Sequence, residues 1–258
     1  MDLNLIGKRA LVCGSTQGMG KAIAEELANC GAQITLFARD EAKLNEVLAG
    51  LKGSGHDCIV ADFDNLEDVK NAVAKGLSSG DYQILVNNTG GPSPGPLSSA
   101  SLDQFDTAIS RHLHVSHTLV QMLLAGMKSA NYGRIVNIIS TSVKVPIPNL
   151  GVSNTVRGAM ASWAKTLATE LGSFGITVNN ILPGFINTAR IESLIASKAS
   201  TGGSSKAEVR KTMEETIPAK RFGEAHEIAD YAAFLCSPSG AYINGTSLRV
   251  DGGRTGSI

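Results

Sequence analysis

The segment Cys13-Gly-Ser-Thr-Gln-Gly-Met-Gly20 decides the fold of this chain. It follows the apolar run Arg9–Cys13 and precedes a stretch with apolar residues at helical spacing. The three glycines allow a tight turn and a close approach of backbone to phosphate. A helix that begins near Gly18 directs its N–H groups and the positive end of its dipole at that anion. A strand, a glycine-rich turn and an amphipathic helix in this order predict a dinucleotide-binding site.

Short strands and longer amphipathic stretches alternate along the rest of the chain. This alternation favours parallel strand pairing through right-handed crossovers. We therefore expect an α/β fold, a single doubly wound Rossmann-type domain over residues 1–258, with a parallel seven-stranded sheet and helices on both faces. The strands are predicted at Arg9–Cys13, Gln33–Ala38, Asp57–Val60, Gln83–Asn87, Gly133–Ser140, Ile176–Leu182 and Thr246–Val250.

The composition excludes several classes of protein. Of the 258 residues 43% are hydrophobic and 18% are charged, which supports a sizeable core and excludes intrinsic disorder. Lys plus Arg and Asp plus Glu number 23 each, so no net field attracts nucleic acid or an anionic membrane. No apolar run approaches the roughly 18 residues of a membrane span, and Met1–Lys8 lacks a signal-peptide pattern. We predict a cytoplasmic protein.

The four cysteines follow no metal-binding or redox pattern. They are Cys13, Cys30, Cys58 and Cys236, and none forms a C-x-x-C pair or fits a zinc motif. Most lie in apolar stretches, which favours reduced, structural thiols.

Two segments interrupt the alternation of strands and helices. Gly90–Ser99 is rich in Gly, Pro and Ser, and Gly184–Pro218 is a long excursion. Both begin at the carboxyl end of a predicted strand, where doubly wound sheets bind ligands. The excursion at about residues 184–218 is therefore predicted to be a lid or substrate-binding element. Its basic residues alternate with glutamates, which favours a solvated helix face over contact with a phosphorylated carrier. They are Arg190, Lys198, Lys206, Arg210 and Lys211.

The end of the second predicted strand bears on the choice of cofactor. An acidic residue there would bind the ribose 2′-hydroxyl and favour NAD. The chain instead has Ala38 followed by Arg39, whose guanidinium can hold a 2′-phosphate. We predict NADP(H) in preference to NAD(H). The alternative is a solvated arginine at a strand end.

Further motifs resemble the short-chain dehydrogenases/reductases along nearly the whole chain. Gly14-x-x-x-Gly18-x-Gly20 has the glycine spacing of that family, and Asn87-Asn88-Thr89-Gly90 resembles its Asn-Asn-Ala-Gly motif. Gly133-Arg-Ile-Val-Asn137 and Gly175-Ile-Thr-Val-Asn179 most resemble the 3-oxoacyl-[acyl-carrier-protein] reductases. The resemblance implies reduction of a small-molecule or acyl-thioester carbonyl. It also implies a homo-tetramer or homo-dimer that associates through helices over Ser101–Met127 and Leu150–Leu171 and through the last strand.

The resemblance further implies which residues bind the cofactor. Asp62 would contact the adenine, and Thr188 the nicotinamide amide. The full set is Gly14, Ser15, Thr16, Gln17, Gly18, Met19, Gly20, Arg39, Asp62, Phe63, Asn88, Gly90, Arg157, Pro183, Gly184, Ile186 and Thr188.

The catalytic positions depart from the pattern of the family, which uses an Asn, a Ser, a Tyr and a Lys. Ser140 occupies the Ser position, but Ser153 stands at the Tyr position, Arg157 at the Lys position and His112 at the Asn position. A serine hydroxyl has a pKa far above the value of about 10 of a tyrosine phenol. An arginine does not deprotonate and cannot pass a proton on. We therefore predict an atypical active site that lacks the usual proton relay.

The remaining roles follow from these substitutions. Ser140 would orient the carbonyl, Arg157 would hold the nicotinamide ribose, and His112 would donate a proton directly or through water. The alternative for His112 is a buried imidazole with a structural hydrogen bond. We predict no metal site at His112, His114 and His117, because helical residues two apart point in different directions.

None of the four tyrosines, Tyr82, Tyr132, Tyr231 and Tyr242, is predicted to replace the missing phenol. A second class of function therefore stays open, a non-catalytic NADP(H)-binding homologue that acts as a sensor, scaffold or partner subunit.

Overall fold

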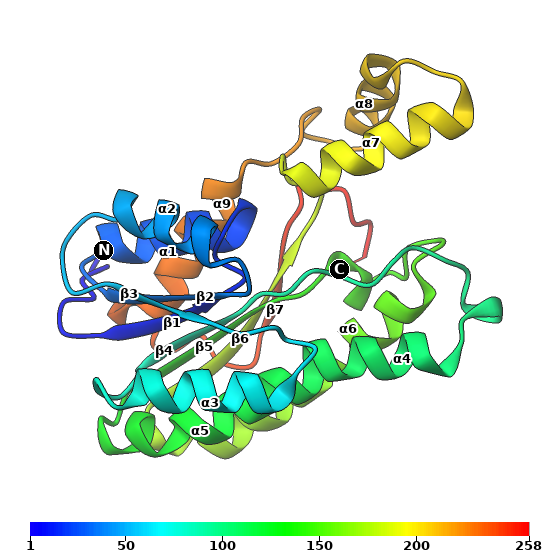
Figure 1. The fold of residues 1–258 in the computed structure, drawn as a ribbon. Helices are drawn as coiled ribbons and strands as arrows, with labels where there is room; N and C mark the ends of the chain where they lie inside the picture. The colour runs from blue at the N-terminus through cyan, green and yellow to red at the C-terminus, as the bar shows by residue number, and fades with distance from the viewer. Residues whose placement is uncertain (258) are drawn as a thin grey trace.

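A parallel sheet of seven strands organises the chain in the computed structural model, which describes residues 1–257 (Figure 1). The strand order is β3-β2-β1-β4-β5-β6-β7. The order reverses between β1 and β4, and a doubly wound sheet binds its ligand at this point, beyond the carboxyl ends of the strands. The strands are β1 (Arg9–Cys13), β2 (Gln33–Ala38), β3 (Asp57–Val60), β4 (Ile84–Asn87), β5 (Gly133–Ile138), β6 (Ile176–Pro183) and β7 (Ser247–Val250).

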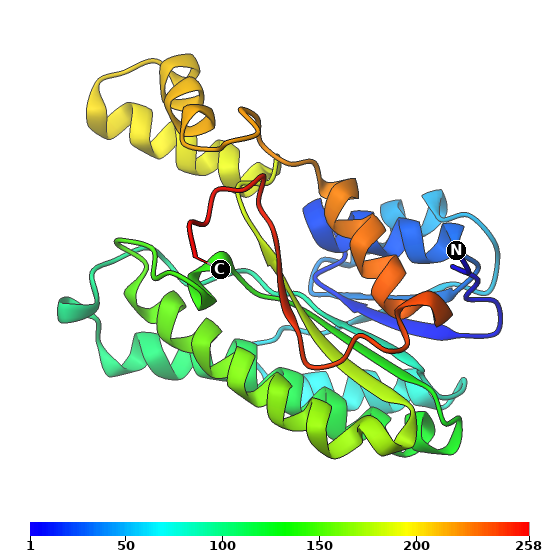
Figure 2. The same ribbon diagram turned by 180° about the vertical axis from the view of Figure 1, so that it is seen from behind.

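Helices cover both faces of the sheet, as Figures 1 and 2 show. One face carries α1 (Gly18–Asn29), α2 (Glu41–Gly50) and α9 (Ala225–Cys236). The other face carries α3 (Leu66–Leu77), α4 (Leu102–Ile109), α5 (Val115–Ser129) and α6 (Gly151–Leu171). The predicted Rossmann-type α/β architecture is confirmed.

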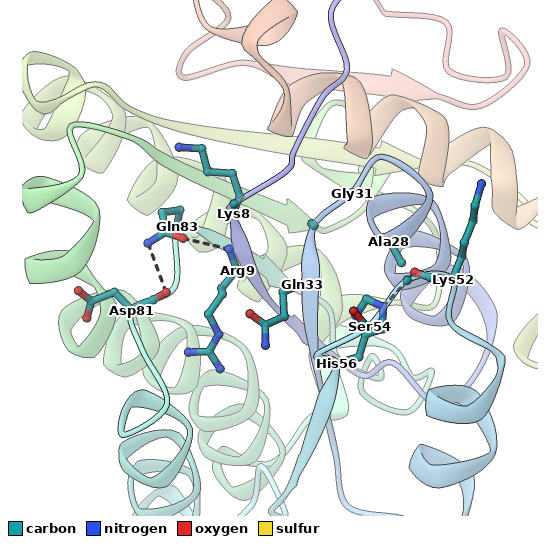
Figure 3. Close-up of a pocket in the computed structure, with 13 residues that line it drawn as sticks. Lys8, Arg9, Ala28, Gly31, Gln33, Lys52, Ser54, His56, Asp81 and Gln83 are labelled. Atoms are coloured by element: carbon teal, nitrogen blue, oxygen red, sulfur yellow. Dashed lines mark hydrogen bonds between the residues drawn. The ribbon is translucent and has the colours of Figure 1, made fainter.

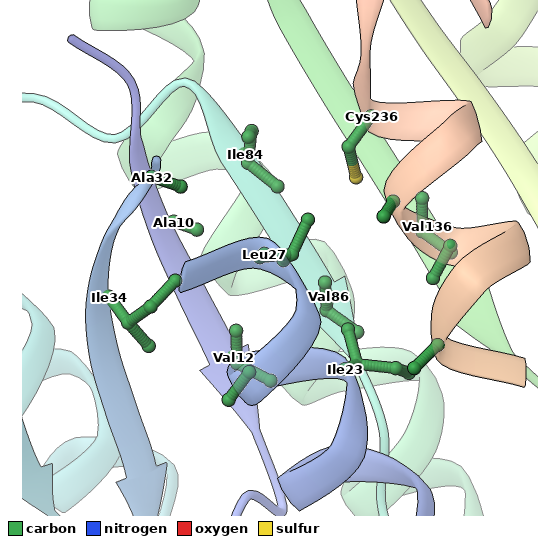
Figure 4. Close-up of a cluster of buried hydrophobic side chains, with 14 of the residues drawn as sticks. Ala10, Val12, Ile23, Leu27, Ala32, Ile34, Ile84, Val86, Val136 and Cys236 are labelled. Carbon is green, nitrogen blue, oxygen red and sulfur yellow. The ribbon is translucent and has the colours of Figure 1, made fainter. Parts of the chain in front are cut away.

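Each face of the sheet buries its own hydrophobic core. Val12 and Val86 point toward α1, where they meet Ile23 and Leu27, and all four are fully buried (Figure 4). Leu11, the neighbour of Val12, belongs to the core on the opposite face. Successive strand residues point to opposite faces, so strands buried on both sides are apolar throughout. For this reason the strands could be recognised as short apolar runs.

The helix predicted over Ser101–Met127 is present from Leu102 to Ser129, but its central turn is π-helical. A π-helical turn, Ser110–His114, separates α4 from α5 and contains the buried His112. A π-helical turn inserts an extra residue into a helix and is frequent at functional sites. The strand predicted at Gly133–Ser140 ends at Ile138, so Ser140 lies beyond the sheet.

The excursion over residues 184–218 contains two helices, α7 (Ala189–Gly202) and α8 (Lys206–Glu215). They stand beyond the carboxyl edge of the sheet and are visible at the top of Figure 1. A small core of its own holds this pair together, formed by Ile191, Ile195, Met213, Ile217 and Phe222. Within residues 1–257 no helix has the length and apolar character needed to cross a bilayer.

Candidate active site

The glycine-rich turn has no room for side chains where it approaches the sheet. Gly14 and Gly18 have φ angles of +60° and +57°, in the left-handed region. A Cβ atom on Gly20 would lie 2.2 Å from the carbonyl oxygen of Gly14. The side chain of Gln17 does not cap the helix α1 that follows, and its first turn carries no acidic residue. This cradle fits the phosphates of a dinucleotide, which take hydrogen bonds from a helix start.

Two predicted cofactor residues hold the turn in place with their side chains. The Asn88 amide donates hydrogen bonds to the carbonyl oxygens of Cys13 and Gly14, at 3.3 and 3.2 Å. Ser15 is fully buried, and its hydroxyl accepts a hydrogen bond from the Phe37 N–H. The turn is thus fixed to β2 and to the end of β4 before any ligand binds.

The predicted 2′-phosphate site lies at the carboxyl ends of β2 and β3. The Arg39 side chain is 73% exposed, and its guanidinium lies 3.7 Å from the Asp62 carboxylate. Both residues line a surface cavity of about 620 Å³. The next residue, Phe63, packs edge-on against Phe37, with ring centroids 4.9 Å apart. An exposed guanidinium with one distant acidic partner is free to bind a phosphate.

A ladder of buried amides joins the strands beneath the catalytic positions. Asn87 donates to Asn137 at 2.8 Å, Asn137 donates to Asn180 at 2.9 Å, and Asn180 donates to Ser247 at 3.0 Å. These residues are opposite one another in the register of β4 to β7. The ladder satisfies polar groups that would otherwise be costly to bury, and it fixes the strand ends that carry the site.

His112 is buried next to the segment that follows β4. Only 3% of its surface is exposed, and its Nδ1 atom lies 2.5 Å from the Thr89 hydroxyl. Burial, with smaller contributions from Arg157, Arg111 and Arg190, lowers the pKa of His112 from 6.5 to about 3. The imidazole is therefore neutral at physiological pH. A neutral ring is not the acid that direct proton donation requires, and this disfavours one of the two predicted roles.

Arg157 extends from α6 toward the end of β5. It is 7% exposed, and its Nη1 atom donates a hydrogen bond to the Ile138 carbonyl at 3.2 Å. Burial and the nearby Arg190 lower its pKa to about 10, so the guanidinium stays charged at neutral pH. Arg190, in the first turn of α7, donates to the Gly91 carbonyl at 3.4 Å.

The two predicted serines have different surroundings. The Ser140 hydroxyl accepts a hydrogen bond from the Ser142 N–H at the start of a short turn after β5. Ser153 lies in the first turn of α6, is partly exposed, and makes no side-chain hydrogen bond within residues 1–257. No histidine or carboxylate contacts either hydroxyl in the part of the chain described.

The tyrosines lie away from the carboxyl edge of the sheet. Tyr82 and Tyr132 precede β4 and β5, Tyr231 lies in α9, and Tyr242 is fully exposed in the segment before β7. The hydroxyl of Tyr132 donates to the Cys236 carbonyl. All four cysteines are free thiols, and burial raises the pKa of Cys13 and Cys236 to about 12.

A second cavity lies at the opposite end of the sheet. It has a volume of about 350 Å³ and is lined by Arg9, Gln33 and His56, among others (Figure 3). Both ring nitrogens of His56 are hydrogen-bonded within the protein, to the Ile34 N–H and the Lys52 carbonyl. This cavity is far from the glycine-rich turn, and within residues 1–257 the Nε and Nη2 atoms of its buried Arg9 make no hydrogen bond, although Nη2 lies 3.6 Å from the Asp57 carboxylate.

Two of the predicted cofactor residues contact the glycine-rich turn from other parts of the chain. The Asn88 amide binds the glycine-rich turn, and Thr188 lies over Gly18, where an added Cβ would meet its methyl group at 3.3 Å. Arg39 and Asp62 form a separate outer end at the edge of the sheet. The sequence did not single out Thr89 as the partner of His112. A signal was available, because Thr89 replaces the alanine of the family motif where His112 replaces its asparagine.

Comparisons with known proteins agree with this geometry. Residues 14–255 match the family described as enoyl-(acyl carrier protein) reductase. A tropinone reductase homologue of Arabidopsis thaliana is 33% identical over 98% of this chain and 92% of its own. Gluconate 5-dehydrogenase of Gluconobacter oxydans is 30% identical over 99% of this chain and 97% of its own. The chain belongs to the short-chain dehydrogenase/reductase family.

Solved structures show the same fold with a bound cofactor. L-sorbose reductase from Gluconobacter frateurii, complexed with NADPH and L-sorbose, superimposes with a TM-score of 0.93 at 30% identity, over 100% of both chains. A putative NAD(P)-dependent gluconate 5-dehydrogenase from Beutenbergia cavernae with bound NADP has a TM-score of 0.88 at 28% identity, again over 100% of both chains. The cofactors of these neighbours agree with the predicted preference for NADP(H).

Proposed function

We propose that this protein is an atypical NADP(H)-dependent reductase of a carbonyl compound. The observation that carries the proposal is that the glycine-rich cradle and a polar site with a buried cation, Arg157, lie at the same edge of the sheet. Asn88 connects the cradle to β4, and Arg157 reaches the end of β5, two strands beyond β1. When bound, NADPH supplies a hydride to a carbonyl carbon.

Gly14, Gly18, Gly20 and the start of α1 hold the cofactor phosphates in this proposal. Arg39 binds the 2′-phosphate and Asp62 the adenine. Asn88 and Thr188 fix the cofactor beside the site.

The residues of the site stabilise the negative charge that develops on the carbonyl oxygen during reduction. The Ser140 hydroxyl donates a hydrogen bond to that oxygen, and the Arg157 cation stabilises it through the low-dielectric interior while it holds the ribose. His112 is neutral and holds a water molecule in place. That water gives its proton to the oxygen, and the resulting hydroxide exchanges with bulk solvent. Neither a tyrosine nor a lysine is needed for this sequence.

The substrate is a ketone or a 3-oxoacyl thioester, and residues 184–218 form the lid that binds it. The relatives named for sugars favour a small ketone, such as a ketose. The 3-oxoacyl thioesters remain the second class to be assayed. We expect the protein to act in the cytoplasm as a homo-dimer or homo-tetramer.

One observation favours a non-catalytic alternative. Ser153 is a poor acid and the pKa of His112 is about 3, so no side chain of the site is an acid that titrates near neutrality. A protein of this kind would bind NADP(H) and act as a sensor, scaffold or partner subunit.

NADPH oxidation by the purified protein, measured against ketoses, diketones and 3-oxoacyl thioesters, separates the two functions. Ketone-dependent oxidation above the ketone-free rate supports the reductase. Tight NADPH binding without turnover, together with turnover by the S153Y/R157K variant on the same panel, supports the alternative.

A further inference from the structure

Two arginines from distant parts of the chain flank one glycine beside the site. A Cβ atom on Gly91 would lie 3.2 Å from Nη2 of Arg190 and 3.6 Å from Nη2 of Arg157. Arg157 comes from α6, Arg190 from α7, and Gly91 from the segment after β4. The two guanidinium groups therefore converge on the same point from two sides.

The charges of this arginine pair are not compensated within residues 1–257. No carboxylate forms an ion pair with Arg157 or Arg190 in the described chain. The hydrogen-bond partners of their guanidiniums there are the carbonyl oxygens of Ile138 and Gly91. Arg157 is more than nine-tenths buried, and its guanidinium donates to the Ile138 carbonyl through Nη1, which leaves Nη2, facing Gly91, without a hydrogen bond to the described residues.

Arg157 is buried and Arg190 is exposed, and their like charges repel each other where they converge, so an anion bound between them would relieve this repulsion. A guanidinium presents paired N–H groups that match a carboxylate or a phosphate. The arginine pair thus supplies the charge and the paired N–H donors that an anionic substituent requires.

We propose that Arg157 and Arg190 bind an anionic group, a carboxylate or a phosphate, on the ketone substrate. This inference rests on the proposed reductase function and narrows its substrate class to keto acids or keto phosphates. Arg190 lies on the lid helix α7 and Arg157 on the body of the domain, so an anion held by both joins the lid to the body.

Binding to the NADP⁺ complex tests the pair without any need for turnover. Calorimetric titrations compare acetoacetate with its neutral methyl ester, and dihydroxyacetone phosphate with neutral dihydroxyacetone. We expect the anionic member of at least one couple to bind on the order of tenfold tighter or more. The couple that shows the preference identifies the group as a carboxylate or a phosphate.

Variants assign the preference to the arginine pair. R190Q is expected to weaken binding of the anion on the order of tenfold to a hundredfold, with little change for the neutral compound. R190K should recover part of that loss. K198Q removes an exposed charge from the same helix and serves as the matched control, with no change expected.

Three results would overturn the proposal. The first is equal binding of anionic and neutral compounds, or no binding of either anion. The second is an equal loss in R190Q and K198Q. The third is a loss of NADP⁺ affinity in R190Q with unchanged anion binding, which would assign the pair to the cofactor. Anion binding through Arg190 without NADPH oxidation of any ketone would instead refute the reductase function and leave the anion site intact.

Discussion

The Nδ1 atom of His112 lies 2.5 Å from the Oγ1 atom of Thr89, and this contact buries an imidazole at the edge of the proposed active site. The π-helical turn Ser110–His114 places the ring there. His112 and Thr89 stand where the family motifs have an asparagine and an alanine, and in this chain the two side chains contact each other.

The buried His112 predicts a dependence of stability on pH. Burial lowers the pKa of His112 from its ordinary value of 6.5 to about 3 in the folded protein, so the unfolded chain binds more protons between these values. The free energy of unfolding should therefore fall as the pH is lowered through this window, by up to about 1.4 kcal/mol per pH unit from this group. Urea denaturation from pH 7 to pH 4 measures it.

H112N should remove the contribution of His112 to the pH dependence of the free energy of unfolding. The control is H114N, at an exposed position of the same segment, which should retain this contribution. If the free energy of unfolding depends on pH in the same way in H112N and in the unmodified protein, the His112 ring is not held in its neutral form by burial.

Gly20 should tolerate no side chain. In G20A the new methyl group would collide with the Gly14 carbonyl at 2.2 Å, and it would also approach the Asn88 amide. We expect loss of NADPH binding by more than about tenfold and destabilisation of about 1–3 kcal/mol, from overpacking. Fluorescence titration with NADPH and thermal unfolding measure the two effects. The control is G50A, where nothing lies within 4 Å of the added atom. Unchanged NADPH affinity in G20A would contradict the cradle.

Arg39 should determine the choice between the two cofactors. R39A should raise the Kd of NADPH on the order of tenfold to a hundredfold and leave the Kd of NADH nearly unchanged, because only NADPH carries the 2′-phosphate. The neighbouring K43A provides the matched control, since Lys43 pairs with Asp40. Equal losses for NADPH and NADH in R39A would show that the guanidinium does not recognise the phosphate.

Asn137 is the centre of the amide ladder and should be important for stability. N137A would leave the Asn87 donor and the Asn180 acceptor without partners in a fully buried layer. Each unsatisfied group costs about 1–3 kcal/mol, so we expect about 2–5 kcal/mol in total. Chemical denaturation measures the loss, and N29A on the exposed side of α1 should cost far less. A loss below about 0.5 kcal/mol in N137A would show that the ladder contributes little to stability.

The sequence was sufficient for the fold because its signals are local. Strands buried on both faces are apolar throughout, and the glycines of the turn are required by positive φ angles at Gly14 and Gly18. The π-helical turn could not be predicted, because helical periodicity does not reveal one extra residue in a turn. Its consequence, the burial of His112, depends on packing against the segment after β4.

The candidate site was predicted only where its residues belong to local sequence motifs. The positions of Ser140, Ser153 and Arg157 followed from alignment with the family motifs. The convergence of Arg190 and Arg157 on Gly91 could not be predicted, because these residues are far apart in the sequence and come together only in the folded chain. In the sequence, Arg190 is one basic residue among several in a mixed-charge helix.

Transfer of deuterium from [4-²H]NADPH, followed by mass spectrometry of the alcohol product, tests the central claim most directly. The claim is that a chain with Ser153 and Arg157 at these positions reduces a carbonyl. We predict that the unmodified protein places deuterium on the carbinol carbon of at least one ketone in the panel. The contradictory result is a protein that binds NADPH and transfers no deuterium, while S153Y/R157K transfers it to the same ketones.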